Sequence, residues 1–187
     1  MQVDPTEIPD VKLIIPRRIG DARGWFSETW NAGAMRAVGL DFDFVQDNHS
    51  LSVPVFTLRG LHYQAPPYAQ TKLVRCGRGR IVDVAVDVRP GSKTYGKWVA
   101  AELSSAIGEQ LLIPQGFLHG FVTLEPNTEV LYKVDAPYNR EADGAVRFDD
   151  PDLAIDWTVA HENLVLSEKD ASAPLLRNWK NPFGDMT

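Results

Sequence analysis

Several short runs of this chain alternate hydrophobic and polar residues with a period of two, the pattern of strands that are buried on one side. Residues 11–16 and 25–30 are the first of these runs, and a glycine-containing turn at 20–24 separates them. Alternation in the second run places Phe26 and Glu28 on one face. The chain is therefore expected to begin with a hairpin-like pair of strands.

A short helix is predicted next. Asn31 can cap a helix over residues 32–38, and Gly39 can close it. Strand-like alternation returns in residues 42–48 and again in residues 51–58, which continue into a glycine-containing stretch of the same character. We therefore expect one early helix followed by two more strands.

Strand signals dominate after residue 70, where apolar and β-branched runs are separated by Gly and Pro. The strands predicted here cover residues 72–76, 81–88, 95–103, 110–114 and 128–134. Residues 114–121 contain two glycines and are expected to form a bend. Strands of this length at roughly ten-residue spacing are typical of sandwiches and barrels. The pattern predicts an all-β fold, a jelly-roll β-barrel with a few short peripheral helices.

The length of 187 residues suits one well-packed core. We expect residues 1–187 to form a single domain, with residues 1–10 as an N-terminal arm and residues 171–187 as a C-terminal tail. The last third of the chain is rich in loops, and short helical turns are predicted near residues 160–162 and 168–170.

Composition narrows the classes of function. The net charge of -6 argues against a nucleic-acid surface, and no apolar run approaches the ~20 residues that a membrane span needs. The acidic N-terminus lacks the features of a secretory signal, and Cys76 is the only cysteine, so we expect a cytoplasmic protein without an internal disulfide. An anionic ligand would have to be met locally by a few cations, for which the candidates are Arg23, Arg59 and Lys72.

Metal and nucleophilic chemistry are not favoured by these residues. The four histidines, His49, His62, His119 and His161, are far apart and form no His-x-His pair. Cys76 lies in the middle of a predicted strand, where a buried, inert thiol is the usual case. No metal is therefore expected, although a metal-dependent barrel stays open as an alternative.

Proton transfer is the chemistry that remains. Arg59 and His62 place a fixed cation and a titratable imidazole on either side of Gly60. Asp170 is a candidate partner that would fix the tautomer of His62, and Tyr132, on the inward face of a predicted strand, is a candidate general acid. Each of these residues also has an ordinary structural interpretation as a strand-end or core residue.

The spacing of Arg59 and His62 makes a geometric prediction. Strict alternation places residues three apart on opposite faces of a strand. Both side chains can line one pocket only if the strand bulges or bends near Gly60, where glycine allows it. We predict that irregularity.

Several segments of the chain resemble the dTDP-4-dehydrorhamnose 3,5-epimerases, cupin-fold enzymes of deoxysugar biosynthesis. The matching segments are residues 21–28, 46–50, 58–64, 72–75, 83–87, 113–121, 132–133 and 166–170. The resemblance implies a cupin-type barrel and a cofactor-independent epimerisation of a dTDP-linked 4-keto-6-deoxyhexose. In that reaction the C4 ketone acidifies the protons on C3 and C5, so that dTDP-4-dehydro-6-deoxy-D-glucose becomes dTDP-4-dehydro-L-rhamnose.

The resemblance also implies roles for individual residues. His62 would be the base, Asp170 its support and Tyr132 the acid on the other side of the sugar, while Lys72 would stabilise the enolate oxygen. The implied substrate-binding residues are Arg23, Phe26, Glu28, Gln46, Asn48, Arg59, His119, Tyr138, Asp143 and Lys169, with Glu141 as a rival to Asp143. A homodimer is implied too, with an exchange of N-terminal residues between barrels as one arrangement.

Three departures from the family pattern bear on the details. Phe56-Thr57 stands where Gly-Val is common, Leu118 where alanine is usual, and Arg147-Phe148 where a tryptophan-bearing segment is found. Leu118 precedes His119 directly, so its side chain, larger than alanine, is a candidate to narrow the pocket. The alternatives are a monoepimerase acting at C3 or C5 alone and a non-catalytic cupin that binds a nucleotide sugar.

Overall fold

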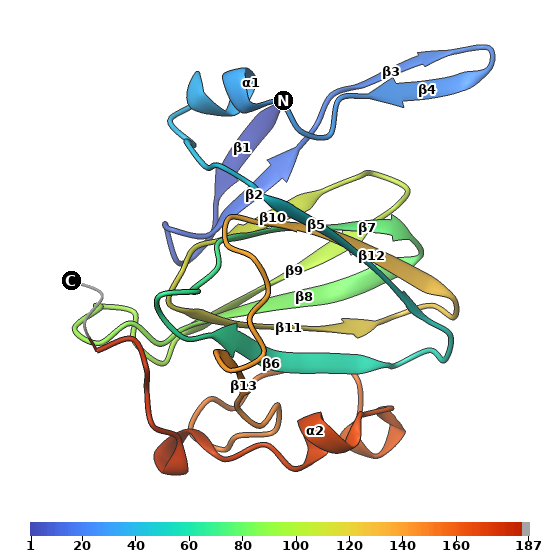
Figure 1. Ribbon diagram of the computed structural model, residues 1–187. Helices are drawn as coiled ribbons and strands as arrows, with labels where there is room; N and C mark the ends of the chain where they lie inside the picture. The colour runs from blue at the N-terminus through green and yellow to red at the C-terminus, as the bar shows by residue number, and fades with distance from the viewer. Residues whose placement is uncertain (185–187) are drawn as a thin grey trace.

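Two antiparallel sheets face each other in the computed structural model, which describes residues 1–184 (Figure 1). The first sheet has the order β1 (Gln2–Pro5), β2 (Lys12–Ile15), β10 (Gln110–Ile113), β7 (Lys72–Arg78), β12 (Thr128–Val134) and β5 (Gln46–Ser52). The second has the order β13 (Asp143–Ala145), β6 (Leu58–Gln64), β11 (Phe117–Thr123), β8 (Arg80–Asp87) and β9 (Trp98–Ser104). The predicted all-β fold is confirmed.

The main core lies between the two sheets, where inward-facing residues of both meet. Its fully buried members include Val74, Ile81, Leu111 and Val130. Almost every residue of β8 is buried, because a second core covers the outer face of its sheet. In that second core, residues of β6, β8 and β11 pack against the chain after residue 145, including Trp157 and Phe183. Strand β8 therefore has the continuous apolar run of a strand covered on both faces.

The outer face of the first sheet is covered by the segment that carries α1 (Ala32–Arg36). Asn31 caps α1 as predicted, because its side chain accepts a hydrogen bond from the Ala34 amide at 3.0 Å. The predicted strand over residues 42–48 is wrong before Gln46. Phe42 and Phe44 instead pack with α1 and its neighbours over this face, so their alternation serves packing and not strand pairing.

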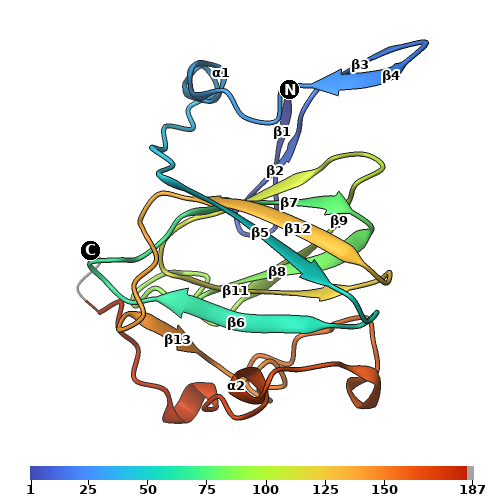
Figure 2. The ribbon, with the colours of Figure 1, turned by 45° about the vertical axis from the view of Figure 1, so that its right-hand side comes forward.

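The predicted pairing of residues 11–16 with residues 25–30 is wrong, because the first run is β2, which pairs with β1 and β10. The partner of β4 (Gly24–Ser27) is instead β3 (Arg18–Asp21), and the two form a separate hairpin that projects away from the barrel (Figures 1 and 2). Strand β4 ends at Ser27 and not at residue 30. The base of the hairpin is anchored by Arg18, whose guanidinium lies 3.8 Å from the Trp25 ring centre and donates to the Ser105 carbonyl at 2.8 Å.

The predicted bend over residues 114–121 is confirmed at residues 115–116, which form a turn, and is wrong from Phe117 onward, where β11 (Phe117–Thr123) begins. Every residue of β11 is buried, and the strand pairs with β6 on one side and β8 on the other. The backbones of β11 and β6 approach closely at Gly120, where a Cβ would lie 3.2 Å from the Gly60 Cα. Leu118 points into the outer core and does not line the barrel interior.

The remaining differences concern strand ends and short elements. Strand β5 ends at Ser52 and β6 begins at Leu58, so residues 51–58 are not one strand. Strand β9 begins at Trp98, three residues later than predicted, and β1, β3 and β13 were not predicted. The helical turns expected late in the chain are confirmed as η1 (His161–Asn163) and α2 (Glu168–Ala171), and η2 (Leu176–Asn178) follows them.

The C-terminal tail packs against the back of β6 as far as residue 184. The Trp179 indole donates to the Tyr63 hydroxyl at 2.9 Å, and Phe183 is fully buried beside Tyr63. The final residues of the predicted tail, 185–187, lie outside the described part of the chain.

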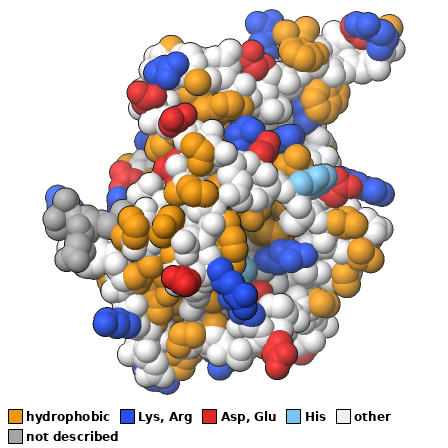
Figure 3. Space-filling view, viewed as in Figure 1, with side chains coloured by type: hydrophobic (Ala, Val, Ile, Leu, Met, Phe, Trp, Pro, Cys, Tyr) orange, Lys and Arg blue, Asp and Glu red, His pale blue; other side chains and the backbone are white. Residues whose placement is uncertain are grey.

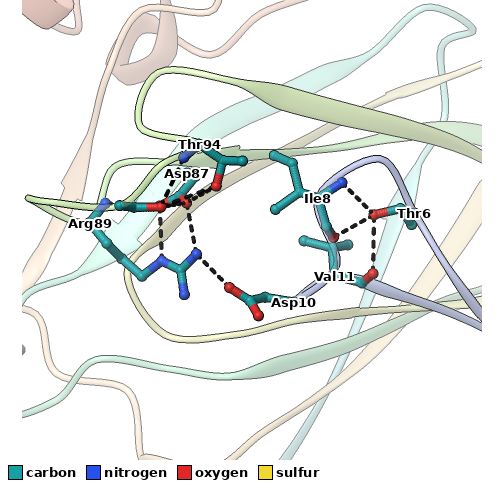
Figure 4. Close-up of polar contacts among 8 residues, drawn as sticks. Thr6, Ile8, Asp10, Val11, Asp87, Arg89 and Thr94 are labelled. Atoms are coloured by element: carbon teal, nitrogen blue, oxygen red, sulfur yellow. Dashed lines mark hydrogen bonds and ion pairs between the residues drawn. The ribbon is translucent and has the colours of Figure 1, made fainter.

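A buried carboxylate ties the N-terminal segment to the barrel at the end of β8 (Figure 4). Asp87 accepts two hydrogen bonds from the Arg89 guanidinium, at 2.9 and 2.7 Å, and others from Ser92 and Thr94. Arg89 also reaches Asp10 at 2.7 Å. Burial alone would raise the pKa of Asp87, but the hydrogen bonds from Arg89, Ser92 and Thr94 together lower its pKa to about 2.

Candidate active site

Strand β6 is irregular at Gly60, as the spacing of its polar residues predicted. His62 pairs with His119 and Arg59 with Phe121, so three steps along β6 match two along β11. Gly60 has a φ of 142°, and the peptide bond that follows it is cis. The extra residue brings Arg59 and His62 to the same face, while Leu58 and Leu61 belong to the outer core.

His62 is paired with the carboxylate that the sequence suggested. Its Nε2 lies 2.6 Å from Asp170 Oδ1, across 108 residues of sequence. Asp170 is buried on α2, whose first turn is capped by the Ser167 hydroxyl. Burial would raise the pKa of Asp170, but the hydrogen bond and charge of His62, with Ser167, hold that pKa below its usual value. The ionised carboxylate therefore fixes the His62 ring and leaves Nδ1 for other partners.

A second histidine–carboxylate pair stands beside the first. His119 Nε2 lies 2.7 Å from Asp83 Oδ1, and the His119 and His62 backbones are direct partners in the β11–β6 ladder. This pair is deeper, since the side chains of His119 and Asp83 are 8% and 0% exposed against 32% for His62. Burial lowers the pKa of His119 even though the charge of Asp83 opposes that change.

Lys72 and Tyr132 approach from the first sheet. Lys72 lies on the same face of β7 as Val74 and Cys76 of the main core, and Tyr132 packs against that core from β12. Burial lowers the pKa of Lys72 to about 8, although Asp83 and Asp143 both oppose that change. Burial also raises the pKa of Tyr132, which keeps its phenol protonated at neutral pH.

Arg59 and His62 line a pocket of about 420 Å³ between β5, β6 and α2. The Arg59 guanidinium is held from β5, where it donates to Ser52 Oγ and to the Leu51 carbonyl, each at 3.2 Å. Figure 3 shows basic side chains gathered with a histidine in a hollow near the centre of the face that β5 and β6 border. A larger groove of about 1020 Å³ lies over β9 and the N-terminal segment and holds none of the predicted site residues.

Part of the expected nucleotide-binding set borders the same region. Gln46 donates to Asn48 at 2.8 Å and accepts from the Tyr138 amide at 2.9 Å, which ties β5 to the loop after β12. Lys169 and Asp143 form an ion pair of 2.5 Å that joins α2 to β13. Glu141, the rival of Asp143, is exposed.

The other part of that set is not brought to the site within one chain. Arg23, Phe26 and Glu28 belong to the projecting hairpin and the residue that follows it. The Arg23 side chain is 89% exposed and pairs only with Asp21 among residues 1–184, while Phe26 is 69% exposed. A single barrel therefore leaves these side chains without a neighbouring site.

Asp83 was the residue that sequence reasoning missed. The signal was present, because Asp83 is a charged residue on the inward face of the apolar, β-branched run 81–88.

Two further observations concern nucleophilic and metal chemistry. The pKa of the buried Cys76 thiol is raised to about 11 by burial, so it is a poor nucleophile. Within residues 1–184, no group of three or more His, Cys, Asp or Glu converges as in a metal site.

The fold and site define a class of protein. A barrel that holds a histidine–aspartate pair, a protonated phenol and a buried ammonium in one interior is equipped for proton transfer at a carbon next to a carbonyl. Within the described residues, no helix is long and apolar enough to cross a membrane.

Comparison with known proteins identifies the family. The family model for dTDP-4-dehydrorhamnose 3,5-epimerase matches residues 5–178. Curated 3,5-epimerases include one from Sinorhizobium fredii, 53% identical over 94% of this chain and 90% of its own, and one from Escherichia coli K12, 47% identical over 91% of each. The chain belongs to the dTDP-4-dehydrorhamnose 3,5-epimerase family, whose members are isomerases, and the resemblance found in the sequence is confirmed.

Solved structures agree with this assignment. A Legionella pneumophila 3,5-epimerase in complex with dTDP-4-keto-L-rhamnose superposes with a TM-score of 0.91 at 41% identity, covering 96% of this chain and 94% of that one. A 3'-monoepimerase from Streptomyces bikiniensis in complex with dTDP-quinovose gives 0.84 at 30% identity, covering 92% and 87%. The cupin-type jelly-roll fold is thereby confirmed.

Proposed function

We propose that this chain converts dTDP-4-dehydro-6-deoxy-D-glucose into dTDP-4-dehydro-L-rhamnose by epimerising C3 and C5. The observation that carries the proposal is the hydrogen bond between His62 on β6 and Asp170 on α2. Both His62 and Lys72 lie close enough to the buried His119 for their charges to act on it, and Tyr132 packs on the main core from β12. The complex of the Legionella relative with dTDP-4-keto-L-rhamnose supports a dTDP-linked keto sugar as the ligand.

Each epimerisation is a pair of proton transfers. His62, held through Nε2 by Asp170, takes the proton from the carbon next to the ketone through its free Nδ1, and the electron pair of the broken C–H bond moves onto the carbonyl oxygen. The Lys72 ammonium stabilises that enolate oxygen. Tyr132 then gives its phenolic proton to the opposite face of the carbon, which inverts its configuration. The raised pKa of Tyr132 suits this acid role.

Binding is divided between the two ends of the ligand. Arg59 and His119 hold the sugar, and Arg59 is pre-oriented by Ser52 and the Leu51 carbonyl. The nucleotide and diphosphate are held by the residues at the pocket border, Gln46, Asn48, Tyr138, Asp143 and Lys169. The contact of Asp143 with Lys169 favours Asp143 over the exposed Glu141 in this set.

We further propose that the chain acts as a homodimer in the cytoplasm. The projecting hairpin exposes Trp25, Phe26 and Ile19, each at least 58% exposed. An apolar arm that stands clear of its own barrel is suited to a protein partner. A second copy of this chain would bring Arg23, Phe26 and Glu28 to the nucleotide end of its partner's pocket, where a guanidinium can grip diphosphate.

Solvent exchange tests the function directly. In heavy water, with dTDP-4-dehydro-6-deoxy-D-glucose as substrate, we expect deuterium to enter the sugar at both C3 and C5, as followed by NMR. Exchange at C3 alone would make the chain a monoepimerase, and no exchange at either carbon would leave a non-catalytic sugar-binding cupin.

The base is tested by His62→Asn, which should abolish exchange while dTDP binding, measured by calorimetry, stays within a few-fold. His49→Asn is the matched control, because His49 pairs with Glu129 at 3.0 Å and is exposed on β5. Unchanged exchange in His62→Asn would remove His62 from the role of base.

A further inference from the structure

Asp83 is an unusual residue for the interior of a barrel. Its side chain is fully buried on β8, on the same face as the core residues Ile81 and Ala85. One carboxylate oxygen is bonded to His119 at 2.7 Å. The other, Oδ2, has no hydrogen-bond partner, and it is the single buried side-chain nitrogen or oxygen of residues 1–184 in that state.

An unpartnered buried carboxylate is costly unless a nearby cation compensates it. His119 does not supply that cation, because burial lowers its pKa and favours the neutral ring. Lys72 on β7 faces the same interior, because it shares its face of the strand with the core residues Val74 and Cys76. If holding the His119 ring were the only task of residue 83, the amide oxygen of an asparagine would accept the same hydrogen bond. The feature left to explain is the negative charge.

We propose that Asp83 is a positioning residue of this site, whose negative charge keeps the Lys72 side chain protonated inside the barrel. The inference rests on the proposed role of Lys72, because only a charged ammonium stabilises an enolate oxygen in the way described above. Asp83 itself touches neither the substrate nor the reacting atoms in this scheme.

The charges around Lys72 support this assignment. The titratable and charged groups that share its surroundings are Arg59 and His62 on β6, Asp83 on β8, His119 on β11, Tyr132 on β12 and Asp143 on β13. Two of them are carboxylates that raise the pKa of Lys72 against the effect of burial, and Asp83 is the stronger. Asp143 is already paired with Lys169 at 2.5 Å. Asp83 is therefore the carboxylate whose charge is left for Lys72.

The test is Asp83→Asn, which keeps the shape and the acceptor for His119 but removes the charge. The rate of deuterium exchange at C3 and C5 is measured as a function of pH. In the wild type this rate should fall at basic pH as Lys72 deprotonates, with a midpoint near the Lys72 pKa of about 8. In Asp83→Asn we expect that midpoint to move to lower pH. A change that only disturbed packing would lower exchange at every pH and leave the midpoint in place.

Asp87→Asn is the matched control. Asp87 is also a fully buried carboxylate on β8, but its partners are Arg89, Ser92 and Thr94 at the strand end, so its loss should not move the midpoint. A second measurement is independent of turnover: the Lys72 side chain is titrated by NMR in protein labelled with ¹³C-lysine. Its midpoint should also fall in Asp83→Asn and stay in place in Asp87→Asn.

An unmoved Lys72 titration in folded Asp83→Asn would overturn the inference. A wild-type Lys72 that is already deprotonated at neutral pH would overturn it as well, and this result needs no variant to fold. Absence of deuterium exchange in the wild type would instead refute the proposed function, while the Lys72 titration would still decide the role of Asp83.

Discussion

Replacing Lys72 with methionine should make the protein more stable and inactive. Methionine is close to lysine in length but carries no charge, so Lys72→Met removes the ammonium and leaves an apolar side chain in the barrel. The pKa of Lys72, lowered from 10.5 to about 8, corresponds to about 3 kcal/mol against the charged form at pH 7. This figure already includes the attraction of Asp83 and Asp143. Because Lys72 keeps some contact with solvent, we expect the free energy of unfolding of Lys72→Met to exceed that of the wild type by about 1–3 kcal/mol at pH 7.

The pH dependence of that gain has a definite sign. Below pH 8 the lysine is charged in both the folded and unfolded chains, and the folded state carries the full penalty. As the pH rises from about 8 to 10.5, the folded chain loses the proton first, so the penalty is relieved. The advantage of Lys72→Met should therefore be full at pH 7 and largely gone near pH 10.

Urea unfolding at the two pH values measures this effect, and deuterium exchange measures the activity, which should fall by about 10²-fold or more. Lys133→Met is the control. The Lys133 side chain lies on the surface of β12 and pairs with a mostly exposed Asp47 at 2.8 Å, so its loss should change stability by less than about 1 kcal/mol. A Lys72→Met protein that is no more stable at pH 7, or whose gain persists at pH 10, would refute the reasoning.

Two other substitutions test the framework of the site. Gly120→Ala would place a methyl group 3.0 Å from the Arg59 carbonyl oxygen, so we expect a loss of about 2–3 kcal/mol in thermal unfolding and weaker exchange, whereas Gly20→Ala on the hairpin should change neither. Asp87→Asn should cost about 2 kcal/mol at pH 7, because a folded pKa of about 2 against an ordinary 3.8 stabilises the protein above pH 4. That difference should shrink as the pH falls toward 2 in urea unfolding, and a constant difference would contradict the assignment.

The strands that could be predicted are those whose side-chain pattern and pairing agree. Strand β8 is a β-branched run that is buried on both faces, and β12 alternates as its two different faces require. Strand β11 could not be found in this way: Gly116 does form a turn just before it, but Gly120 carries the same signal within the strand. Tertiary contact overrides that signal, because the absence of a side chain at Gly120 lets two backbones meet.

The sequence suggested which residues meet around His62 more clearly than it suggested how they meet. The spacing of Arg59 and His62 required an irregular strand, and β6 has one at Gly60. Asp170 could be suggested as the partner of His62, but sequence spacing does not show that the two meet, because the contact joins a strand to a helix 108 residues later. The position of Arg23 depends on the direction in which the β3–β4 hairpin projects from the barrel, and local sequence patterns do not determine that direction.

Two chemically identical pairs stand side by side in this barrel, and their surroundings separate their tasks. His62 and His119 each present Nε2 to an aspartate, and their backbones are partners across β6 and β11. His119 is 8% exposed, and burial favours its neutral form, which suits a group that orients a ligand. His62 is 32% exposed beside the pocket, which suits a group that must reach a ligand. This difference in depth supports the proposals that the outer pair holds the base and that the charge of the inner carboxylate serves the lysine.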